Sequence, residues 1–273
     1  MYKKTKKNVK NRIKKFVQKL NYTIDVDRVE YSLNFSSPDA HLKDPNLLVL
    51  HQSNPSFVFW DQKPNFEIIT YSSDGSDHNP NFFSGLSNYK SYLAQHYPLQ
   101  TEGWGDSFDN IKSRILQRHS NILMCPNDVY VSASAINSIF AVANVHKLDF
   151  FHPSLSYCSY WSFEHLLNKP GFIVRQAPHI EAIMPGFSNR AFACLQQIPA
   201  ISKSAYGYAN KLWPCIANKN ALTTAIIDSV VIRHMRPVRS NVQVFADGSS
   251  AYDHSNAVSQ YIEDNKLFLA NLL

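Results

Sequence analysis

A single carboxylate, Asp128, stands where a hydrophobic segment of the sequence ends. The run Ser120–Cys125 is apolar enough to form a buried strand, and Pro126, Asn127 and Asp128 follow it directly. A side chain at the end of such a strand projects from the sheet edge into a cleft, where open α/β sheets bind their ligands. A carboxylate there can help to hold a divalent cation on a diphosphate. The alternative is that Asn127 and Asp128 simply cap the next turn.

Basic side chains gather late in the chain around a histidine. Arg233, Arg236 and Arg239 flank His234. Arginine binds phosphate oxygens through paired donors, so this group can neutralise a diphosphate, which would suit a site that is poor in metal ligands. The alternative is an ordinary basic loop exposed to solvent.

The sequence also excludes several kinds of chemistry. It contains no Gly-x-Gly-x-x-Gly, no P-loop and no Gly-x-Ser-x-Gly, so a dinucleotide enzyme, an NTPase and an α/β-hydrolase lack support. The four cysteines are widely spaced, with no Cys-x-x-Cys and no nearby histidine pair. They are therefore predicted to be buried thiols rather than zinc ligands or disulfides.

Alternating strands and helices are predicted to position these residues. The predicted strands are Leu47–Leu50, Phe66–Tyr71, Ser120–Cys125, Leu148–Phe151 and a stretch within Ala221–Ile232, with two short strands broken by Pro178 inside 172–187. The predicted helices are Phe108–His119 and Ser134–His146. The polar loop Ser72–Asp77 follows one of the strands and carries Asp74, at a strand end where ligands bind. The order predicts a single large α/β domain.

The N-terminus carries much of the formal charge of +6. Residues 1–20 contain many lysines and no acidic residue, and their apolar side chains recur at helical spacing. This pattern predicts a basic amphipathic helix over residues 1–22 that lies on an anionic membrane surface. A solvated tail and an RNA-binding arm are the alternatives. No transmembrane run or signal peptide is evident, so we expect a cytoplasmic protein associated peripherally with the inner face of the membrane.

Two blocks of short motifs occur in a recognisable order. The first, between Asn121 and Phe192, contains Asp128, Ile136-Asn137, His152-Pro153-Ser154-Leu155, Ser159-Tyr160, Arg175 and Glu181-Ala182-Ile183-Met184-Pro185-Gly186-Phe187. The second contains Leu212-Trp213-Pro214, Ile226-Ile227-Asp228-Ser229-Val230 and Arg233-His234-Met235-Arg236-Pro237-Val238. Together they cover roughly half of the chain. They resemble an uncharacterised family of bacterial and plant proteins regarded as GT-A-like glycosyltransferases, sometimes labelled lysine-ketoglutarate reductase-like.

The resemblance implies a GT-A-like, Rossmann-related mixed sheet flanked by helices. It also implies a divalent metal, Mn²⁺ or Mg²⁺, bound through Asp128 and His234. The residues expected to contact substrate are Asn127, Asp74, Arg175, His179, Tyr160 and Arg236, with Asp74 placed near the base or ribose of a nucleotide.

The chain departs from the family pattern at two places. Pro126 and Asn127 stand where the family has carboxylates, and losing these charges weakens the binding of a hard cation. Asn210 lies in a segment where the family has an acidic residue. With that acid absent, Glu181 is the leading candidate for the general base that an inverting transfer needs. The alternative is that Glu181 is a buried structural acid paired with Arg175 or His179.

We therefore expect a glycosyltransferase that moves a sugar from a nucleotide-sugar donor to a cell-surface polysaccharide or glycolipid precursor. The expected parts are the basic helix 1–22, a GT-A-like domain over 40–245 and a C-terminal helical segment over 246–273. One rival is a catalytically degenerate descendant that binds sugars or acts as a scaffold. A second rival is a nucleic-acid-binding protein, but no recognised nucleic-acid module follows the basic tail, so no nucleic-acid partner is expected.

Overall fold

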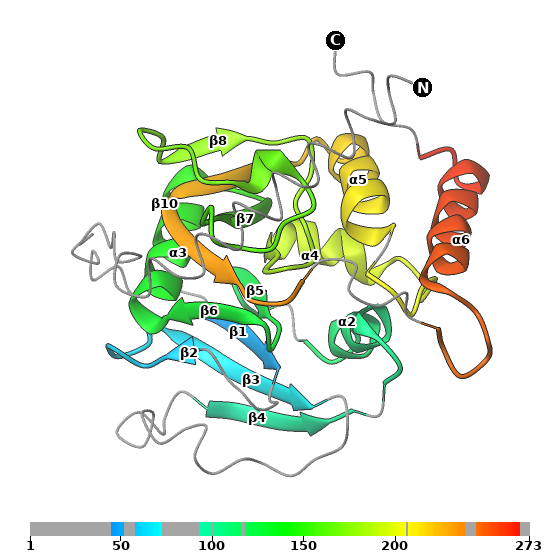
Figure 1. Ribbon diagram of the computed structural model, residues 1–273, viewed down its shortest axis with the longest axis horizontal. Helices are drawn as coiled ribbons and strands as arrows, with labels where there is room; N and C mark the ends of the chain where they lie inside the picture. Colours follow the sequence, from blue (N-terminus) through cyan, green and yellow to red (C-terminus); the bar gives the residue numbers. More distant parts are fainter. Residues whose placement is uncertain are drawn as a thin grey trace.

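A mixed β-sheet forms the centre of the molecule, and helices flank it (Figure 1). The computed structural model describes residues 45–51, 58–72, 93–99, 101–115, 118–205, 207–237 and 244–267. Within these ranges ten strands are joined in the order β2-β6-β10-β7-β9-β5-β1-β3-β4, and β8 pairs with β10. The strands are β1 (Asn46–His51), β2 (Val58–Phe59), β3 (Phe66–Ser72), β4 (Leu93–Pro98), β5 (Asn121–Cys125), β6 (Val129–Ser132), β7 (Phe150–Leu155), β8 (Val174–Gln176), β9 (Gly186–Ser188) and β10 (Thr224–His234).

Five α-helices and two shorter helical turns accompany the sheet in the described residues. They are α2 (Trp104–Lys112), α3 (Ala133–His146), α4 (Asn189–Gln196), α5 (Trp213–Lys219) and α6 (Ala251–Asp264), with a 3-10 turn η2 (Glu164–Leu166) and a π-turn η3 (Tyr208–Leu212). In Figure 1, α3 lies beside β10 and β6, whereas α2, α5 and α6 lie on the other side of the molecule. The described helices contain none that is both long and apolar enough to cross a lipid bilayer.

The strands that matter for the site run in one direction. β1 pairs in parallel with β3 and β5, and β7 pairs in parallel with β10. β9 is antiparallel to both β5 and β7, so these two strands also share a direction. The carboxyl ends of β1, β3, β5 and β10 consequently meet at one edge of the sheet, the edge where ligands bind in open α/β folds.

The core explains why the strand sequences are hydrophobic throughout rather than alternating. In β1, Leu47, Leu48 and Val49 are fully buried, because packing covers both faces of the sheet. On one side, α3 buries Ile136, Ile139, Phe140 and neighbouring apolar residues. On the other, aromatic rings of α2, β9 and α5 contact one another, with Phe187 and Trp213 edge to face at 5.1 Å. Burial on both faces is the signal that made β1, β3 and β5 predictable.

Gly186 shows why a motif of the first sequence block is needed for packing. A Cβ atom at this position would lie 2.0 Å from the ring of Phe151 on β7. The preceding residues tie the same strand to its neighbours, since the Met184 amide donates to His152 Nε2 and Pro185 O accepts from the Met124 amide. This motif therefore inserts β9 between β5 and β7.

The helix predicted over Phe108–His119 is placed wrongly, because α2 covers Trp104–Lys112. Trp104 stacks on Phe108 one turn later, with centroids 5.3 Å apart, and this pair extends the helix toward its N-terminus. At the other end, Gln196 Nε2 donates to the Lys112 carbonyl, the group that a longer helix would use internally. The other strand and helix predictions agree with β1, β3, β5, β7, β8, β9, β10 and α3 to within a few residues.

Some sequence predictions lie outside the described residues. These are the basic amphipathic helix over 1–22, with its lipid-facing lysines, and Asp74 with the rest of its loop. The C-terminal segment does contain a helix, α6, which begins with a capping box between Ser250 and Asp253. The division of the chain at 40–245 and 246–273 stays a prediction.

Candidate functional site

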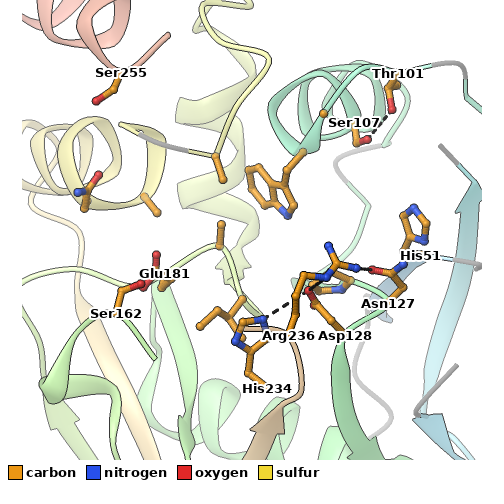
Figure 2. Close-up of a pocket in the computed structure, with 18 of the residues that line it drawn as sticks. His51, Thr101, Ser107, Asn127, Asp128, Ser162, Glu181, His234, Arg236 and Ser255 are labelled. Carbon is orange, nitrogen blue, oxygen red and sulfur yellow. Dashed lines mark hydrogen bonds and ion pairs between the residues drawn. The ribbon is translucent and has the colours of Figure 1, made fainter. Parts of the chain in front are cut away.

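A cavity of about 970 Å³ lies at the carboxyl edge of the sheet (Figure 2). Its floor comes from residues at or just after the strand ends, namely His51, Tyr71, Asn127, Asp128 and His234. Its walls come from α2, from the segment 181–183, from η3 and from α6. The lining residues therefore come from segments between His51 and Ser255. The floor lies at the strand ends where the sequence analysis predicted the site.

Asp128 lies at the centre of a small group of charged side chains. Its Oδ2 atom is 3.4 Å from His234 Nε2 and 3.3 Å from Arg236 Nε. Arg236 Nη2 also donates to Asn127 Oδ1 at 3.1 Å. Figure 2 shows Asn127, Asp128, His234 and Arg236 gathered on one side of the cavity. The structure thus brings together four residues that the sequence analysis had singled out from two distant segments.

Backbone pairing explains why these segments meet. The end of β10 pairs in antiparallel fashion with β6, with His234 opposite Val129. The Met235 amide then donates to the Asp128 carbonyl at 2.7 Å. Since residues two apart on an extended chain point the same way, His234 and Arg236 both face Asp128.

Tyr160 serves the site through its backbone. Its carbonyl lies 2.8 Å from His234 Nδ1, and its amide donates to the His234 carbonyl. Ser159 Oγ accepts from the His234 amide at 3.2 Å. A carbonyl beside Nδ1 fixes that nitrogen as the donor and turns Nε2 toward Asp128. Tyr160 does not line the cavity, and its contact with substrate stays a prediction.

The charges around Asp128 set its protonation state. Burial raises the pKa of the Asp128 carboxyl, but the hydrogen bond and charge of His234 and the charge of Arg236 outweigh burial and bring the pKa below its ordinary value. Asp128 is therefore ionised at neutral pH. Cys125 and Tyr71 have raised pKa values, chiefly from burial, so neither is an ionised nucleophile.

Glu181 lines the cavity at a distance from the Asp128 group. In Figure 2 it lies near Ser162, on the other side from Asn127. The next two residues, Ala182 and Ile183, also line the cavity and make this wall apolar. Glu181 thus places a carboxylate on the wall of the cavity away from Asn127.

Arg175 lies outside the cavity lining and is engaged in the fold. Its Nε atom donates to Asp228 Oδ2 at 2.6 Å, and its Nη2 atom donates to the Leu167 carbonyl at 2.8 Å. Asp228 is fully buried, and it also accepts from the Lys169 amide. Because it is 11% exposed, paired with Asp228 and outside the cavity lining, Arg175 supports the fold here, and its contact with substrate stays a prediction.

His179 also lies behind the cavity rather than in it. Its ring contacts Phe163 edge to face at 4.5 Å and His165 at 4.4 Å. Burial and then the nearby His165 lower the pKa of His179 to about 4, so the ring is neutral at neutral pH. Phe163 does line the cavity. The predicted substrate residue therefore supports a wall residue.

Three arginines had been predicted near the diphosphate. Of these, Arg236 lines the cavity, Arg233 lies on β10 outside the lining, and Arg239 falls outside the described residues. Among the described lining residues, Arg236 is the one lysine or arginine.

Sequence reasoning missed several lining residues, including Trp104 on α2 and Tyr252 and Ser255 on α6. α6 docks through Lys211, whose Nζ donates to Ser255 Oγ and to Ser259 Oγ. No motif marks these residues, because the contact depends on how α6 packs against η3. Asn210, which the sequence singled out as a missing acid, also lines the cavity.

A divalent cation at Asp128 was predicted, and the side chains present fit it poorly. Within the described part of the chain, no three His, Cys, Asp or Glu side chains gather into a possible metal site. Asp128 supplies the single carboxylate, and the same oxygen already faces Arg236. Mg²⁺ and Mn²⁺ are held mainly by charged oxygens in octahedral sets, so this donor set is too small for a site built from protein side chains.

The sheet, its flanking helices and the site at its carboxyl edge define a GT-A-like fold. Two solved glycosyltransferase structures are similar to this chain. One, GalNAc-T7 with UDP, GalNAc and Mn²⁺, has a TM-score of 0.52 and 9% identity over 82% of this chain and 48% of that one. The other, S. aureus TarS 1–349 in complex with UDP-GlcNAc, has a TM-score of 0.51 and 12% identity over 84% of this chain and 68% of that one.

At 9% and 12% identity, these similarities show a shared fold. The chain spans about half the length of the GalNAc-T7 structure. No family model and no curated protein matches the sequence. The GT-A-like fold is therefore confirmed, while membership of the family named from the motifs stays a prediction.

Proposed function

We propose that the protein is a glycosyltransferase that moves a sugar from a nucleotide-sugar donor to an acceptor hydroxyl. The observation that carries the proposal is that one cavity in a GT-A-like fold has different chemical groups on its two sides. Asn127, Asp128, His234 and Arg236 stand on one side, and Glu181 stands on the other. One side suits an anionic leaving group, and the other suits a base. A cavity of about 970 Å³ also has room for a nucleotide sugar.

In the proposed donor complex the diphosphate lies beside Arg236 and His234. Arginine gives phosphate oxygens paired, charge-assisted hydrogen bonds, and the His234 ring lies beside it as a second polar group. Asn127 is proposed to hold the ribose or the arginine, and Asp74 keeps its predicted place near the base or ribose. The recorded ligands of the two similar structures, UDP with GalNAc and UDP-GlcNAc, support a nucleotide-sugar donor.

The proposed reaction is an attack of the acceptor oxygen on the anomeric carbon of the sugar. Glu181 takes the proton from that hydroxyl as the new carbon–oxygen bond forms. The bond between the anomeric carbon and the diphosphate oxygen breaks, and the electron pair leaves with the diphosphate. Arg236 and His234 stabilise the negative charge that develops there, in a partly buried site where such interactions are strong.

The proposed acceptor is a cell-surface polysaccharide or glycolipid precursor. Tyr252 is 67% exposed and Val244 is 65% exposed, and both line the cavity near α6, so this side can admit a large acceptor. The lysines of residues 1–20 are proposed to hold the protein at an anionic membrane surface where such precursors occur. No nucleic-acid partner is part of this proposal.

A thermal-shift screen of the full chain with a panel of nucleotide sugars tests the proposal. A ligand present at about 100 times its Kd stabilises a protein by about 2.7 kcal/mol, so the matching donor should raise Tm by several degrees. Released nucleoside diphosphate would then be measured with and without glycan acceptors. If no nucleotide sugar raises Tm or is turned over, the proposal is wrong.

A catalytically degenerate sugar-binding or scaffolding protein is the second candidate. Pro126, Asn127 and Asn210 favour it, because each stands where the resembled family has an acidic residue, and all three line the cavity. This candidate predicts donor binding without turnover under any acceptor. A stabilising nucleotide sugar that is consumed by the wild type but not by Glu181→Gln would reject it.

A further inference from the structure

We propose that Arg236 takes the place of the divalent cation, so that this site binds the diphosphate of a nucleotide without metal. The inference rests on the proposed function and deepens it, because it assigns the positive charge that holds the donor. It opposes the sequence prediction of Mn²⁺ or Mg²⁺ at Asp128 and His234, and three observations support it.

The first observation is the distribution of charge in the cavity. Glu102, Asp128 and Glu181 contribute carboxylates to the lining, and Arg236 is its one permanent cation among the described residues. Glu102 is paired with Lys203 at 2.8 Å, so the carboxylates that would repel a diphosphate most are Glu181 and Asp128, and Arg236 lies beside Asp128 to offset its charge. Among the described lining residues, Arg236 offers the permanent positive charge against which a diphosphate can lie.

The second observation is the way in which Arg236 is held. Its Nε atom faces Asp128 Oδ2 at 3.3 Å, and its Nη2 atom donates to Asn127 Oδ1 at 3.1 Å. A guanidinium has five N–H donors, so these two contacts orient the group and leave donors for ligand oxygens. The side chain is 57% exposed, which lets a ligand reach it. Asn127 and Asp128 thus position the arginine as a cation-binding motif would position a metal ion.

The third observation is the chemistry of the two positions that lack a carboxylate. Pro126 offers no side-chain ligand, and the Asn127 oxygen is already an acceptor for Arg236. An aspartate at 127 would add a charged oxygen for a metal, whereas asparagine gives a neutral acceptor that suits an arginine donor. A cation bound to Asp128 Oδ2 would also have to displace or repel the guanidinium beside it.

Nucleotide binding to the full chain, measured by titration calorimetry, separates arginine from metal. The probes are the uridine, guanosine, adenosine and cytidine diphosphates, each in EDTA and again with Mn²⁺. We expect at least one to bind in EDTA with a Kd within about threefold of its value with Mn²⁺. Arg236→Gln should weaken that binding about 30-fold or more. Arg236→Lys keeps the charge but not the paired N–H donors of the guanidinium, and it should weaken binding about tenfold.

Arg118→Gln is the matched control. Arg118 is also 57% exposed and is paired with a carboxylate, that of Glu67, but it does not line the cavity. Its substitution should leave nucleotide affinity unchanged. Thermal unfolding of each variant checks that it is folded.

The possible results lead to different conclusions. Binding that is lost in EDTA and restored by Mn²⁺ would overturn the inference and leave the proposed function standing. Binding that ignores both EDTA and Arg236→Gln would also overturn it, since the diphosphate would then lie elsewhere. If none of the four diphosphates binds in either condition, the proposed function fails and the inference with it.

Discussion

Two aspartate–arginine pairs lie along β10, and they differ in how completely they are enclosed. In the middle of the strand, Asp228 has a fully buried side chain and Arg175 is 11% exposed, with a contact of 2.6 Å. At the carboxyl end, Asp128 is 15% exposed and Arg236 is 57% exposed, with a contact of 3.3 Å. The same two residue types thus form a closed pair and an open one.

The difference in exposure decides which pair a ligand can reach. The closed pair has its hydrogen-bonding groups committed, because Asp228 also accepts from the Lys169 amide and Arg175 also donates to the Leu167 carbonyl. The Arg175 side chain is 11% exposed and lies outside the cavity lining, so a ligand in the cavity does not reach its remaining donors. The open pair borders a cavity and keeps donors that a ligand can use. The two pairs therefore differ in access: the arginine of the open pair is 57% exposed at the cavity, and the arginine of the closed pair is 11% exposed outside it.

The largest expected effect breaks the closed pair. Arg175→Leu leaves the Asp228 carboxylate buried without its cation, and we expect the free energy of unfolding to fall by about 3–5 kcal/mol. The double variant Arg175→Leu/Asp228→Leu should recover much of this loss. Arg236→Gln should cost about 1 kcal/mol or less, since exposed pairs contribute little. Urea unfolding measures all three, and equal losses at the two pairs would contradict the distinction drawn between them.

The next effect concerns the chemistry at the open end of the sheet. Glu181→Gln keeps the size of the side chain but removes the proposed base, so kcat should fall about 100-fold or more. The Kd for nucleoside diphosphate should change by about threefold at most, because Glu181 stands away from the diphosphate side. Glu164→Gln, at an exposed position outside the cavity, is the control. Loss of nucleotide affinity together with kcat would show that Glu181 belongs to the donor site instead.

A third variant converts the open pair into a metal site. Asn127→Asp/Arg236→Ala supplies the missing carboxylate and removes the competing cation. Three candidate metal ligands then lie together: the carboxylates at positions 127 and 128 and the His234 ring. We expect Mn²⁺ to strengthen nucleoside diphosphate binding about tenfold in this variant and hardly at all in the wild type. Calorimetry with and without Mn²⁺ measures the difference. An equal response in both proteins would mean that Arg236 and Asn127 do not control metal use.

The smallest expected effect is on acid stability. The pKa of Asp128 lies below its ordinary value of 3.8, so its ionised form contributes stability that is present above about pH 4 and lost as the pH falls through the lower folded value. Asp128→Asn should therefore lose less Tm than the wild type between pH 6 and pH 3, by a few degrees. Thermal scans at both pH values test this. If the wild type and Asp128→Asn lose the same Tm between pH 6 and pH 3, His234 and Arg236 do not favour the ionised carboxylate.

Sequence reasoning found the parts of the fold in which local pattern decides structure. The runs that became β1, β5 and β10 are hydrophobic because both faces of the sheet are covered, and α3 has a clear serine cap at Ser132. It missed β6, four residues of which Tyr130 is exposed, because so short a segment carries too little pattern to distinguish it from a loop. It also missed α4 and α5, whose buried faces depend on neighbours far away in the sequence.

Predicted site residues come together in the structure where a strand end and a motif coincide, and their role in binding or catalysis stays a prediction. Asp128 and His234 were found in this way, and the structure places them 3.4 Å apart. Other motif residues hold the fold together: Asn137 binds the backbone of Asn65 and Lys63, and Arg175 binds Asp228. A motif shows that a residue is needed, but not whether it is needed for packing or for a ligand. That distinction required the partners of each side chain.

The hydrogen bond from the Met235 amide to the Asp128 carbonyl also fixes when the cavity can exist during synthesis of the chain. A growing chain presents Asp128 while His234, 106 residues later, has yet to be translated. Early strands can pair as they emerge, but the floor of the cavity closes only when the end of β10 arrives, and the wall follows with α6. A ribosome-bound fragment that ends before β10 therefore has no complete site, and donor binding would report that the last part of the fold is in place.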